Sequence, residues 1–195
     1  MVDRFRKIIS AVSDVPADET KILLDIAHPQ EIREGDYFLH EGDIPDRFAF
    51  VSSGLFRYFY IDKKGNDCTK GFFPEDTIIS SYSAMIQNRG SHFSIKALED
   101  SVVLVIHNSD WVRLRRERPV WNLFLIAILE KGYGVKESRE REFLLSDARE
   151  RYLTFLKTFP GMEDRIPQHL IASYIGITPV ALSRIRKKMR VVNPG

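Results

Sequence analysis

Basic side chains gather near the C-terminal end of the sequence, where they could bind a polyanion. Between Arg165 and Arg190 there are six lysine and arginine residues and no aspartate or glutamate. The remainder of the chain holds 23 basic residues against 27 acidic ones, so a slightly acidic body carries one strongly basic segment. This asymmetry points to a polyanionic partner such as nucleic acid. A solvated basic helix end without a partner would give the same charge distribution.

The residues of this segment have the spacing of a helix-turn-helix. Pro167 predicts the start of a first helix, and Gly176 predicts its end in the left-handed conformation that glycine tolerates. Thr178 is a suitable N-cap, and Pro179 a suitable first residue, for a second helix. Apolar or small residues occupy the positions where two crossing helices pack, namely Ile171, Ala172, Ile175, Ile177, Leu182 and Ile185. The pattern favours a helix-turn-helix over a plain helical hairpin.

The second helix of this motif supplies the candidate DNA contacts. The N-terminal part of such a helix faces base edges in the major groove, and Arg184, one turn further along, could bind a guanine bidentately. The cations that follow it are better placed for phosphates, and Val180 could contact a thymine methyl group. The candidate DNA-binding residues are Thr178, Pro179, Val180, Ser183, Arg184, Arg186, Lys187 and Lys188. For each cation the alternative is an ordinary solvated surface charge.

The region before these helices reads as antiparallel sheet. From Ile32 to Ile106, short runs rich in Phe, Tyr, Val and Ile alternate with turn sequences such as EGD, SSG, DKKGN and FPED. Turns that recur every 8–12 residues or so between such runs are typical of a β-sandwich or barrel. Before this region, Pro16 and the acidic residues after it predict the start of a short helix.

A long helical region connects the predicted sheet to the helix-turn-helix. It begins at Asn108–Asp110, and Pro119 predicts a break near Arg118 and a new helix after it. Val120–Leu129 is apolar on nearly every side, so a helix there must be covered on every side. A second copy of the same helix would cover it, which predicts a homodimer. The alternative is burial within the core of one chain.

Length and composition limit the classes of protein. The longest apolar window has about 10 residues, whereas a membrane-spanning helix needs about 20. The N-terminal residues lack the apolar run of a signal peptide. The single cysteine, Cys68, excludes an intrachain disulfide framework and a cluster held by several cysteines of this chain. These features predict a cytoplasmic protein without a membrane partner.

A glycine-punctuated roll, a long apolar helix and a C-terminal helix-turn-helix stand in a fixed order. With the stretches GDYFLHEGDIPDRFAFVSSGLFRYF and YIGITPVALSRIRKK, the chain resembles the cyclic-AMP receptor protein/FNR (CRP/FNR) superfamily of bacterial transcription regulators. The resemblance implies an α+β fold: a jelly-roll-like, cyclic-nucleotide-binding-like β-roll sensor over residues 1–108, a dimerisation helix over 109–144 and a winged helix-turn-helix over 145–195. It also implies a homodimer that reads a palindromic operator in double-stranded DNA, with RNA polymerase as a further candidate partner.

The chain departs from this family at the ligand site. Members that bind cyclic AMP carry a glutamate for the ribose and an Arg-Ser pair for the phosphate. Here the glutamate position falls at Ser80 or Ser81, the pair falls at Ser91 and His92, and Arg89 lies two residues too early. A buried phosphate without an arginine is poorly compensated. We therefore expect no cyclic nucleotide and no cofactor, and we treat these five residues as the candidate pocket of an unidentified small effector.

The chain departs from the family at the DNA contacts too. The family's receptor protein begins its reading helix with Arg-Glu, and Pro179 and Val180 stand at these positions here. A different operator is therefore expected. The sequence ends at Gly195, soon after the reading helix, which predicts a short wing or none.

Two other functions share parts of these features. An effector-binding β-roll dimer without DNA function would keep the fold, although the basic segment argues against it. A cupin-type metalloenzyme would need clustered histidine and carboxylate ligands. His40, His92 and His107 lie far apart in the sequence, with no His-x-His pair. We therefore expect a regulator, without metal and without enzymatic activity.

Overall fold

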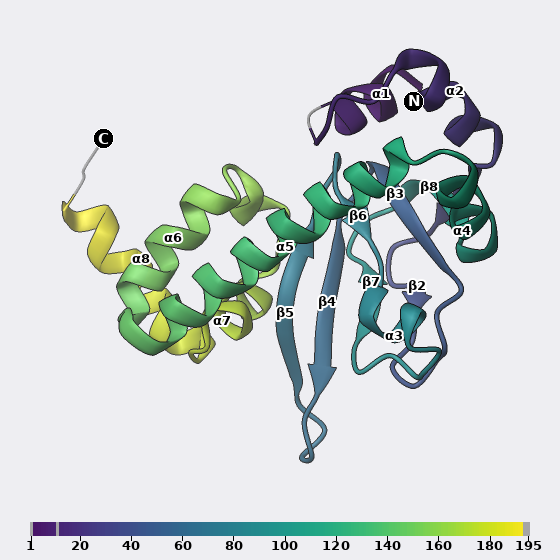
Figure 1. Cartoon of the computed structure of the whole chain (residues 1–195). Coiled ribbons are helices and arrows are strands. Elements are labelled where there is room, and N and C mark those ends of the chain that lie inside the picture. Colours follow the sequence, from purple (N-terminus) through teal and green to yellow (C-terminus); the bar gives the residue numbers. More distant parts are fainter. Residues whose placement is uncertain (1, 11, 193–195) are drawn as a thin grey trace. The chain divides into compact units, whose positions relative to one another are not determined.

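Among the residues that the structure describes, eight antiparallel strands form two facing sheets, which account for most of the first half of the chain (Figure 1). The computed structural model describes residues 2–10 and 12–192. One sheet has the order β1–β8–β3–β6 and the other the order β2–β7–β4–β5. The strand bounds are β1 His28–Ile32, β2 Tyr37–Leu39, β3 Arg47–Ser53, β4 Phe56–Ile61, β5 Asp67–Phe73, β6 Ile78–Ile79, β7 Ser94–Ala97 and β8 Ser101–His107. The predicted antiparallel sandwich is confirmed.

The inner faces of the two sheets form one apolar core. Side chains from both sheets alternate inward because successive residues of a strand point to opposite faces. Phe56 and Ile95 of one sheet and Ile79 and Val103 of the other are fully buried there. A short helix, α3 (Tyr82–Ile86), follows β6 and contributes Met85 to the neighbouring apolar cluster.

Helices close one end of this β-roll with a second apolar cluster. They are α1 (Val2–Ser10), α2 (Ala17–Asp25), α4 (Asn108–Glu117) and the first turns of α5 (Val120–Leu145). Phe5, Trp111, Trp121 and Phe124 pack together there against the β3 residue Phe50. Glu19 of α2 accepts hydrogen bonds from Arg118 Nη1 at 2.8 Å and Trp121 Nε1 at 3.1 Å. The helix predicted after Pro16 is confirmed as α2.

The break predicted at Pro119 separates α4 from α5. Arg118 is extended, with φ −133° and ψ 90°, and α5 starts immediately after the proline. The helix then runs for 26 residues and continues through Gly132 and Gly134. It also includes the charged stretch of residues 137–142, of which Arg139 and Glu142 are half-buried.

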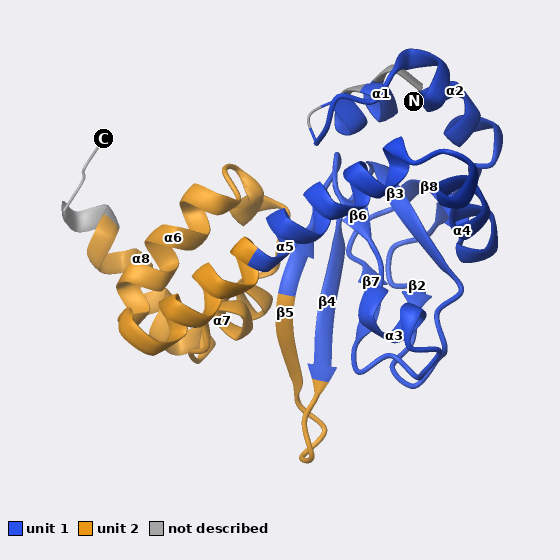
Figure 2. Ribbon diagram, viewed as in Figure 1, with its two compact units in different colours: residues 1–60, 71–133 blue, residues 61–70, 134–195 orange. Residues whose placement is uncertain are grey.

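The chain divides into two compact units (Figure 2). Unit 1 contains residues 1–60 and 71–133, and unit 2 contains residues 61–70 and 134–195. Unit 2 therefore combines the tip of the β4–β5 hairpin, the second half of α5 and the C-terminal helices. These helices are α6 (Ala148–Thr158), α7 (Gln168–Ile175) and α8 (Pro179–Val192), with a 3₁₀ turn, η1, at Met162–Asp164.

A capping box fixes the start of α6. Asp147 accepts a hydrogen bond from the Glu150 N–H at 2.9 Å, and the Glu150 carboxylate accepts one from the Asp147 N–H at 2.9 Å. The helix ends before Pro160-Gly161, and Gly161 has a left-handed φ of 72°. Any wing after α8 would fall outside the described residues.

Candidate nucleic-acid interface and effector pocket

The turn between α7 and α8 has the geometry that the sequence predicted. Gly176 ends α7 with φ 73° and ψ 40°, and its N–H bonds back to the carbonyls of Ala172 and Ser173. Thr178 caps α8, because its hydroxyl accepts a hydrogen bond from the Ala181 N–H at 3.2 Å. The first residues of α8 are thereby held in a defined direction.

Apolar side chains between α7 and α8 hold the two helices together. Ile171, Ala172 and Ile175 of α7 and Leu182 of α8 are fully buried. Ile177 and Ile185 are half-buried. All six positions expected to pack therefore face the inside, completely or in part, and the predicted helix-turn-helix is confirmed as a fold.

The outer face of α8 carries the candidate DNA contacts. Seven of them are exposed, namely Thr178, Pro179, Val180, Ser183, Arg184, Lys187 and Lys188, with Val180 61% exposed. Arg186 differs, since it is half-buried and its Nη1 atom has no hydrogen-bond partner among the described residues. The structure thus brings the exposed candidates onto one helix that is free of acidic side chains.

Two arginines bind the carbonyl groups at the end of α7. Arg139 of α5 donates to the Tyr174 carbonyl, and Arg151 of α6 donates from Nε to the Ile175 carbonyl at 2.8 Å. Arg151 also donates from Nη1 to the Ser146 carbonyl at 2.6 Å. Sequence reasoning missed both residues, because nothing in their local pattern distinguishes them from solvated helix charges.

An aromatic cluster lies behind α7 in unit 2. The Phe155 ring centroid is 5.8 Å from that of Tyr174, and the Phe159 centroid is 5.7 Å from it. Burial raises the pKa of the Tyr174 phenol, and the nearby Arg139 charge acts in the opposite direction. The cluster anchors α7 to α6 and to the residue that follows α6.

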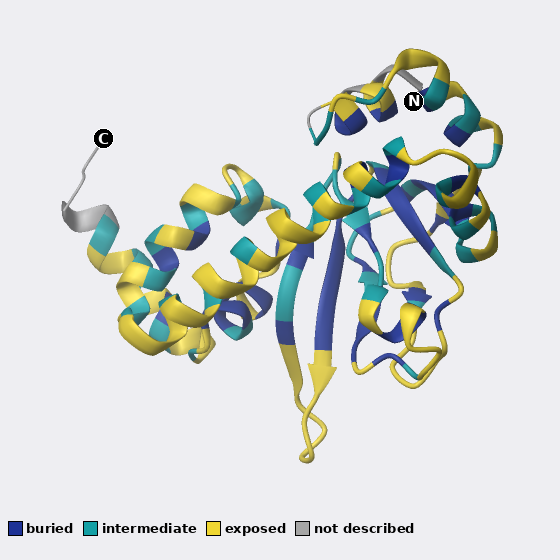
Figure 3. Ribbon diagram, in the orientation of Figure 1, coloured by how far each residue is buried: buried dark blue, intermediate teal, exposed yellow. Residues whose placement is uncertain are grey.

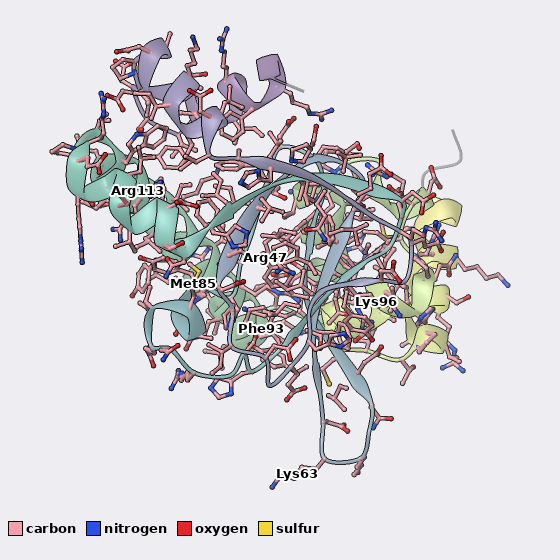
Figure 4. All side chains as sticks on the ribbon, turned by 90° about the vertical axis from the view of Figure 1, so that its right-hand side faces the viewer. Arg47, Lys63, Met85, Phe93, Lys96 and Arg113 are labelled. Carbon is pink, nitrogen blue, oxygen red and sulfur yellow. The ribbon has the colours of Figure 1, made fainter. Side chains whose placement is uncertain are left out.

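The tip of the β4–β5 hairpin also contacts α7. The Thr69 N–H donates to Ser173 Oγ at 2.9 Å. The turn itself is closed by Asp62, whose carboxylate accepts hydrogen bonds from the backbone of Lys64 and Asn66. Lys63 extends from this turn, at the tip of the hairpin (Figure 4). Burial, followed by the Lys136 charge, lowers the pKa of Lys70 to about 8.

The candidate effector residues separate into two groups. Ser81 and Ser91 are buried, and their hydroxyls share a hydrogen bond of 2.9 Å. Ser80, next to them, is half-buried, and its hydroxyl has no partner among the described residues. Arg89 and His92 are exposed. The structure therefore brings the three serines together and leaves the two cationic candidates at the surface.

Aromatic rings fill the interior of the β-roll beside these serines. The Tyr58 ring stacks on Phe73 at 3.9 Å between centroids and on Phe93 at 5.0 Å. The Tyr58 hydroxyl accepts a hydrogen bond from the Ser80 N–H at 2.6 Å. Burial raises the pKa of this phenol. A cyclic nucleotide phosphate does not fit these residues, because the serines offer it no positive charge and the single arginine of the candidate set is exposed.

A cavity of about 330 Å³ opens elsewhere in unit 1 and includes none of the predicted pocket residues. Its lining residues are Phe38, Leu39, Asp43, Ile44, Pro45, Asp46 and Arg47. The Arg47 guanidinium lies 5.3 Å from the centroid of the Phe38 ring and 3.7 Å from the Asp46 carboxylate, so its charge already has a partner. Among residues 2–10 and 12–192, no three His, Cys, Asp or Glu side chains group in a way that could hold a metal ion. No helix of the described chain is both long and apolar enough to cross a bilayer.

Comparison with known proteins identifies the β-roll. Residues 29–118 match the family of the cyclic nucleotide-binding domain. Among curated proteins, none matches the sequence significantly. The matched residues correspond to the roll together with α4.

Solved structures of bacterial regulators share the fold over most of the chain. FixK2 from Bradyrhizobium japonicum has a TM-score of 0.75 at 15% identity, with 85% of each chain covered. The c-di-GMP-responsive global regulator CLP of Xanthomonas campestris has a TM-score of 0.73 at 15% identity, with 90% of this chain and 92% of that chain covered. The catabolite activator protein of Thermus thermophilus has a TM-score of 0.58 at 22% identity, with 90% and 84% covered. The resemblance to CRP/FNR regulators is thereby confirmed in the fold.

Proposed function

We propose that this protein is a DNA-binding transcription regulator of the CRP/FNR type that acts as a homodimer on a palindromic site. The observation that carries this proposal is the exposed face of α8. It combines a capped N-terminus, an exposed Arg184 and further cations, with no acidic residue on the helix. A capped, exposed helix end with basic and without acidic side chains is suited to the major groove.

The order of side chains along α8 supports a division of roles. Thr178, Pro179 and Val180 lie at the start of the helix, which enters the groove in helix-turn-helix proteins. Arg184 follows one turn later and can reach a guanine edge. Lys187 and Lys188 lie further along and can bind phosphates, which position the protein without reading sequence. Arg186 is half-buried, so it is a weaker candidate for a phosphate contact.

Exposed apolar side chains along α5 support the homodimer. Leu123 is 64% exposed, Ile126 50% and Tyr133 69%, although the opposite side of the helix buries Trp121 and Phe124. Apolar residues that remain exposed along one helix face are typical of a dimer interface. Burial in the core of the same chain, the alternative from the sequence, does not cover these three side chains. An Ile126→Asp variant is expected to sediment as a monomer. A variant that still sediments as a dimer, as the wild type does, would contradict the role of this face.

The signal that the β-roll would receive is a small effector other than cyclic AMP, or none. The roll's aromatic stack and its neutral serine pair support this, since neither compensates a phosphate charge. The regulator would act in the cytoplasm, with RNA polymerase as a candidate partner at the promoter.

DNA binding under increasing salt tests the proposal. The full-length protein is titrated into a fluorescent random-sequence duplex, and its affinity is expected to fall steeply as salt rises, because bound phosphates release counterions. Replacing Lys187 or Lys188 by Ala should reduce the slope by about one per residue. A protein that forms a dimer but binds no duplex at low salt would instead be the effector-binding dimer without DNA function.

A further inference from the structure

The end of α7 is held by groups from outside the helix-turn-helix. The last carbonyls of a helix have no partner within the helix and carry its negative dipole end. Here Arg139 donates to the Tyr174 carbonyl and Arg151 donates to the Ile175 carbonyl at 2.8 Å. Both bonds end within two residues of Gly176, the turn residue that precedes the reading helix.

Aromatic contacts fix the two guanidinium groups. Arg139 lies 3.6 Å from the centroid of the Tyr174 ring and 4.4 Å from that of Phe143. Arg151 lies 5.3 Å from the same Phe143 ring, so this side chain contacts both arginines. Glu142 binds Arg139 Nη1 at 3.1 Å. Charge-assisted hydrogen bonds and cation–π contacts act together, which restricts the orientation of each planar group.

Phe143 also contacts the turn directly. A methyl group added at Gly176 would lie 2.8 Å from Phe143 Cε1. The backbone of the turn and the last turns of α5 are therefore in close approach. Because Arg139 and Phe143 belong to the second half of α5, the turn before α8 is attached to that part of the helix within unit 2.

We infer that three positioning residues set the separation of the two DNA half-sites. They are Arg139 and Arg151, here called the arginine pair, and Phe143, whose ring contacts both. This inference rests on the proposed function. If two α5 helices associate, the direction of each α8 relative to the α5 of the same chain fixes the distance between the two reading helices. The arginine pair holds that direction at the turn, without touching DNA itself.

The test varies the spacing of the half-sites. A random duplex library first gives the inverted repeat that the wild-type protein selects, and affinities are then measured for versions with the spacer shortened or lengthened by one and two base pairs. The wild-type protein is expected to lose affinity sharply away from the optimum, because each added base pair also rotates the half-site around the duplex. Arg139→Gln and Arg151→Gln should flatten this profile, reducing the discrimination by roughly tenfold, the factor that loss of a charge-assisted hydrogen bond implies.

Arg141→Gln is the matched control, since Arg141 is exposed on the same helix and the substitution removes the same charge. Its spacing profile should equal that of the wild type. If an Arg139 variant fails to fold, two other variants test the inference. Phe143→Leu removes the aromatic ring while keeping an apolar contact, and Arg139→Lys keeps the positive charge over the Tyr174 ring. Phe143→Leu should flatten the spacing profile, and Arg139→Lys should keep only part of the sharpness of the wild-type profile. A merely stabilising role would lower the melting temperature and leave the optimum spacing as sharp as before.

The outcomes separate the inference from the proposed function. A wild-type protein that selects no inverted repeat would contradict the proposed function. A wild-type protein with a sharp spacing optimum that the folded Arg139, Arg151 and Phe143 variants retain would overturn the inference alone. Affinity for a single half-site should remain within about twofold of wild type in all variants, because the exposed face of α8 is unchanged.

Discussion

The helix-turn-helix and the β-roll both contain candidate binding residues, but the two regions arrange them differently. In unit 2, seven of the eight candidate residues lie exposed along α8, and the residues behind them are packed and hydrogen-bonded. In unit 1, Ser81 and Ser91 are buried and bonded to each other, while Arg89 and His92 are exposed. Unit 2 presents a charged surface to a partner, whereas the interior of unit 1 is occupied by its own side chains.

This difference supports the proposal that the protein recognises its partner at α8 and not in the interior of the roll. A duplex needs an exposed convex surface with positive charge, and α8 supplies one. A small effector needs a concave site with open space and a few well-placed polar groups. The roll interior instead holds the Phe73, Tyr58 and Phe93 stack. An effector that enters there would have to displace these rings.

The largest expected effect comes from a matched pair of glycines, one in each unit. A Cβ at Gly54, which has φ +99°, would lie 2.0 Å from Ser101 Oγ and 2.8 Å from Ser101 Cα. At Gly176 the corresponding Cβ would meet only the edge of a phenyl ring. Gly54→Ala should therefore lower the free energy of unfolding by roughly 3 kcal/mol or more, from left-handed strain and overpacking together, and Gly176→Ala by less.

Urea unfolding measures both variants. Trp111 and Trp121 lie in unit 1, so their fluorescence reports the roll, while far-UV circular dichroism reports the helices of both units. Gly65→Ala is the control, because Gly65 has φ +82° but nothing within 4 Å of the added methyl group. Equal effects of Gly54→Ala and Gly65→Ala would contradict the close approach at Ser101.

The second effect separates base reading from phosphate binding. Arg184→Ala should remove about 1–3 kcal/mol of preference for one base of each half-site while leaving binding to mismatched duplexes nearly unchanged. Affinities for the selected site and its single-base variants measure this. Arg149→Ala, an exposed arginine of α6, should change neither quantity. A base preference that survives in Arg184→Ala would assign the reading role to other residues.

The third effect concerns pH and the hairpin of unit 2. Burial and the Lys136 charge lower the pKa of Lys70 from its ordinary 10.5 to about 8. Between these values the unfolded chain binds more protons than the folded one, so stability should rise with pH, by at most about 1.4 kcal/mol per pH unit. Below pH 8 the amine is protonated in both states, and this dependence should vanish. Circular dichroism during urea unfolding at pH 7–9.5 measures it.

Lys70→Met should be more stable than the wild type at pH 7, and its stability should not show this rise. Lys64→Met serves as control, since Lys64 is exposed in the same hairpin. The pH range stops below 10 because the Tyr174 phenol, whose pKa burial raises, contributes with the opposite sign above it. A Lys70→Met protein with the same rise as wild type would disprove the assignment.

The smallest effect compares two neighbouring serines of the roll. Ser91→Ala removes the hydrogen-bond partner of Ser81 and of the Phe93 N–H, and should cost about 1 kcal/mol. Ser80→Ala removes a buried hydroxyl that has no partner among the described residues, so it should be neutral or stabilising. Tryptophan fluorescence during urea unfolding measures both. A loss of stability in Ser80→Ala that equals the loss in Ser91→Ala would indicate that the Ser80 hydroxyl has a partner after all.

The sequence predicted those parts of the fold that depend on neighbouring residues. Gly176, Thr178 and Pro179 determine the turn of the helix-turn-helix through local geometry, and Pro119 determines the start of α5 in the same way. The alternation of strands with turns predicted the sandwich. In each case the physical cause acts over a few residues, so the order of residues carries the information.

Prediction from the sequence failed for side chains whose surroundings depend on segments far away in the sequence. Arg139 appears in a run of charges that looks solvated, yet it binds a carbonyl 35 residues later. Arg89 appears close enough to Ser91 to share a pocket with it, but the fold leaves its side chain exposed. Whether an arginine is solvated, caps a helix or lines a pocket depends on which surfaces the fold brings together. No local pattern encodes that outcome.

Selection of binding sites from a random double-stranded DNA library tests whether α8 reads DNA sequence. The full-length protein is expected to enrich an inverted repeat whose half-site centres lie about 34 Å apart, one helical turn of the duplex. Arg184→Ala should enrich a repeat with one position relaxed in each half-site. Enrichment of no common sequence by the folded, dimeric wild-type protein would contradict the account of α8 as a reading helix.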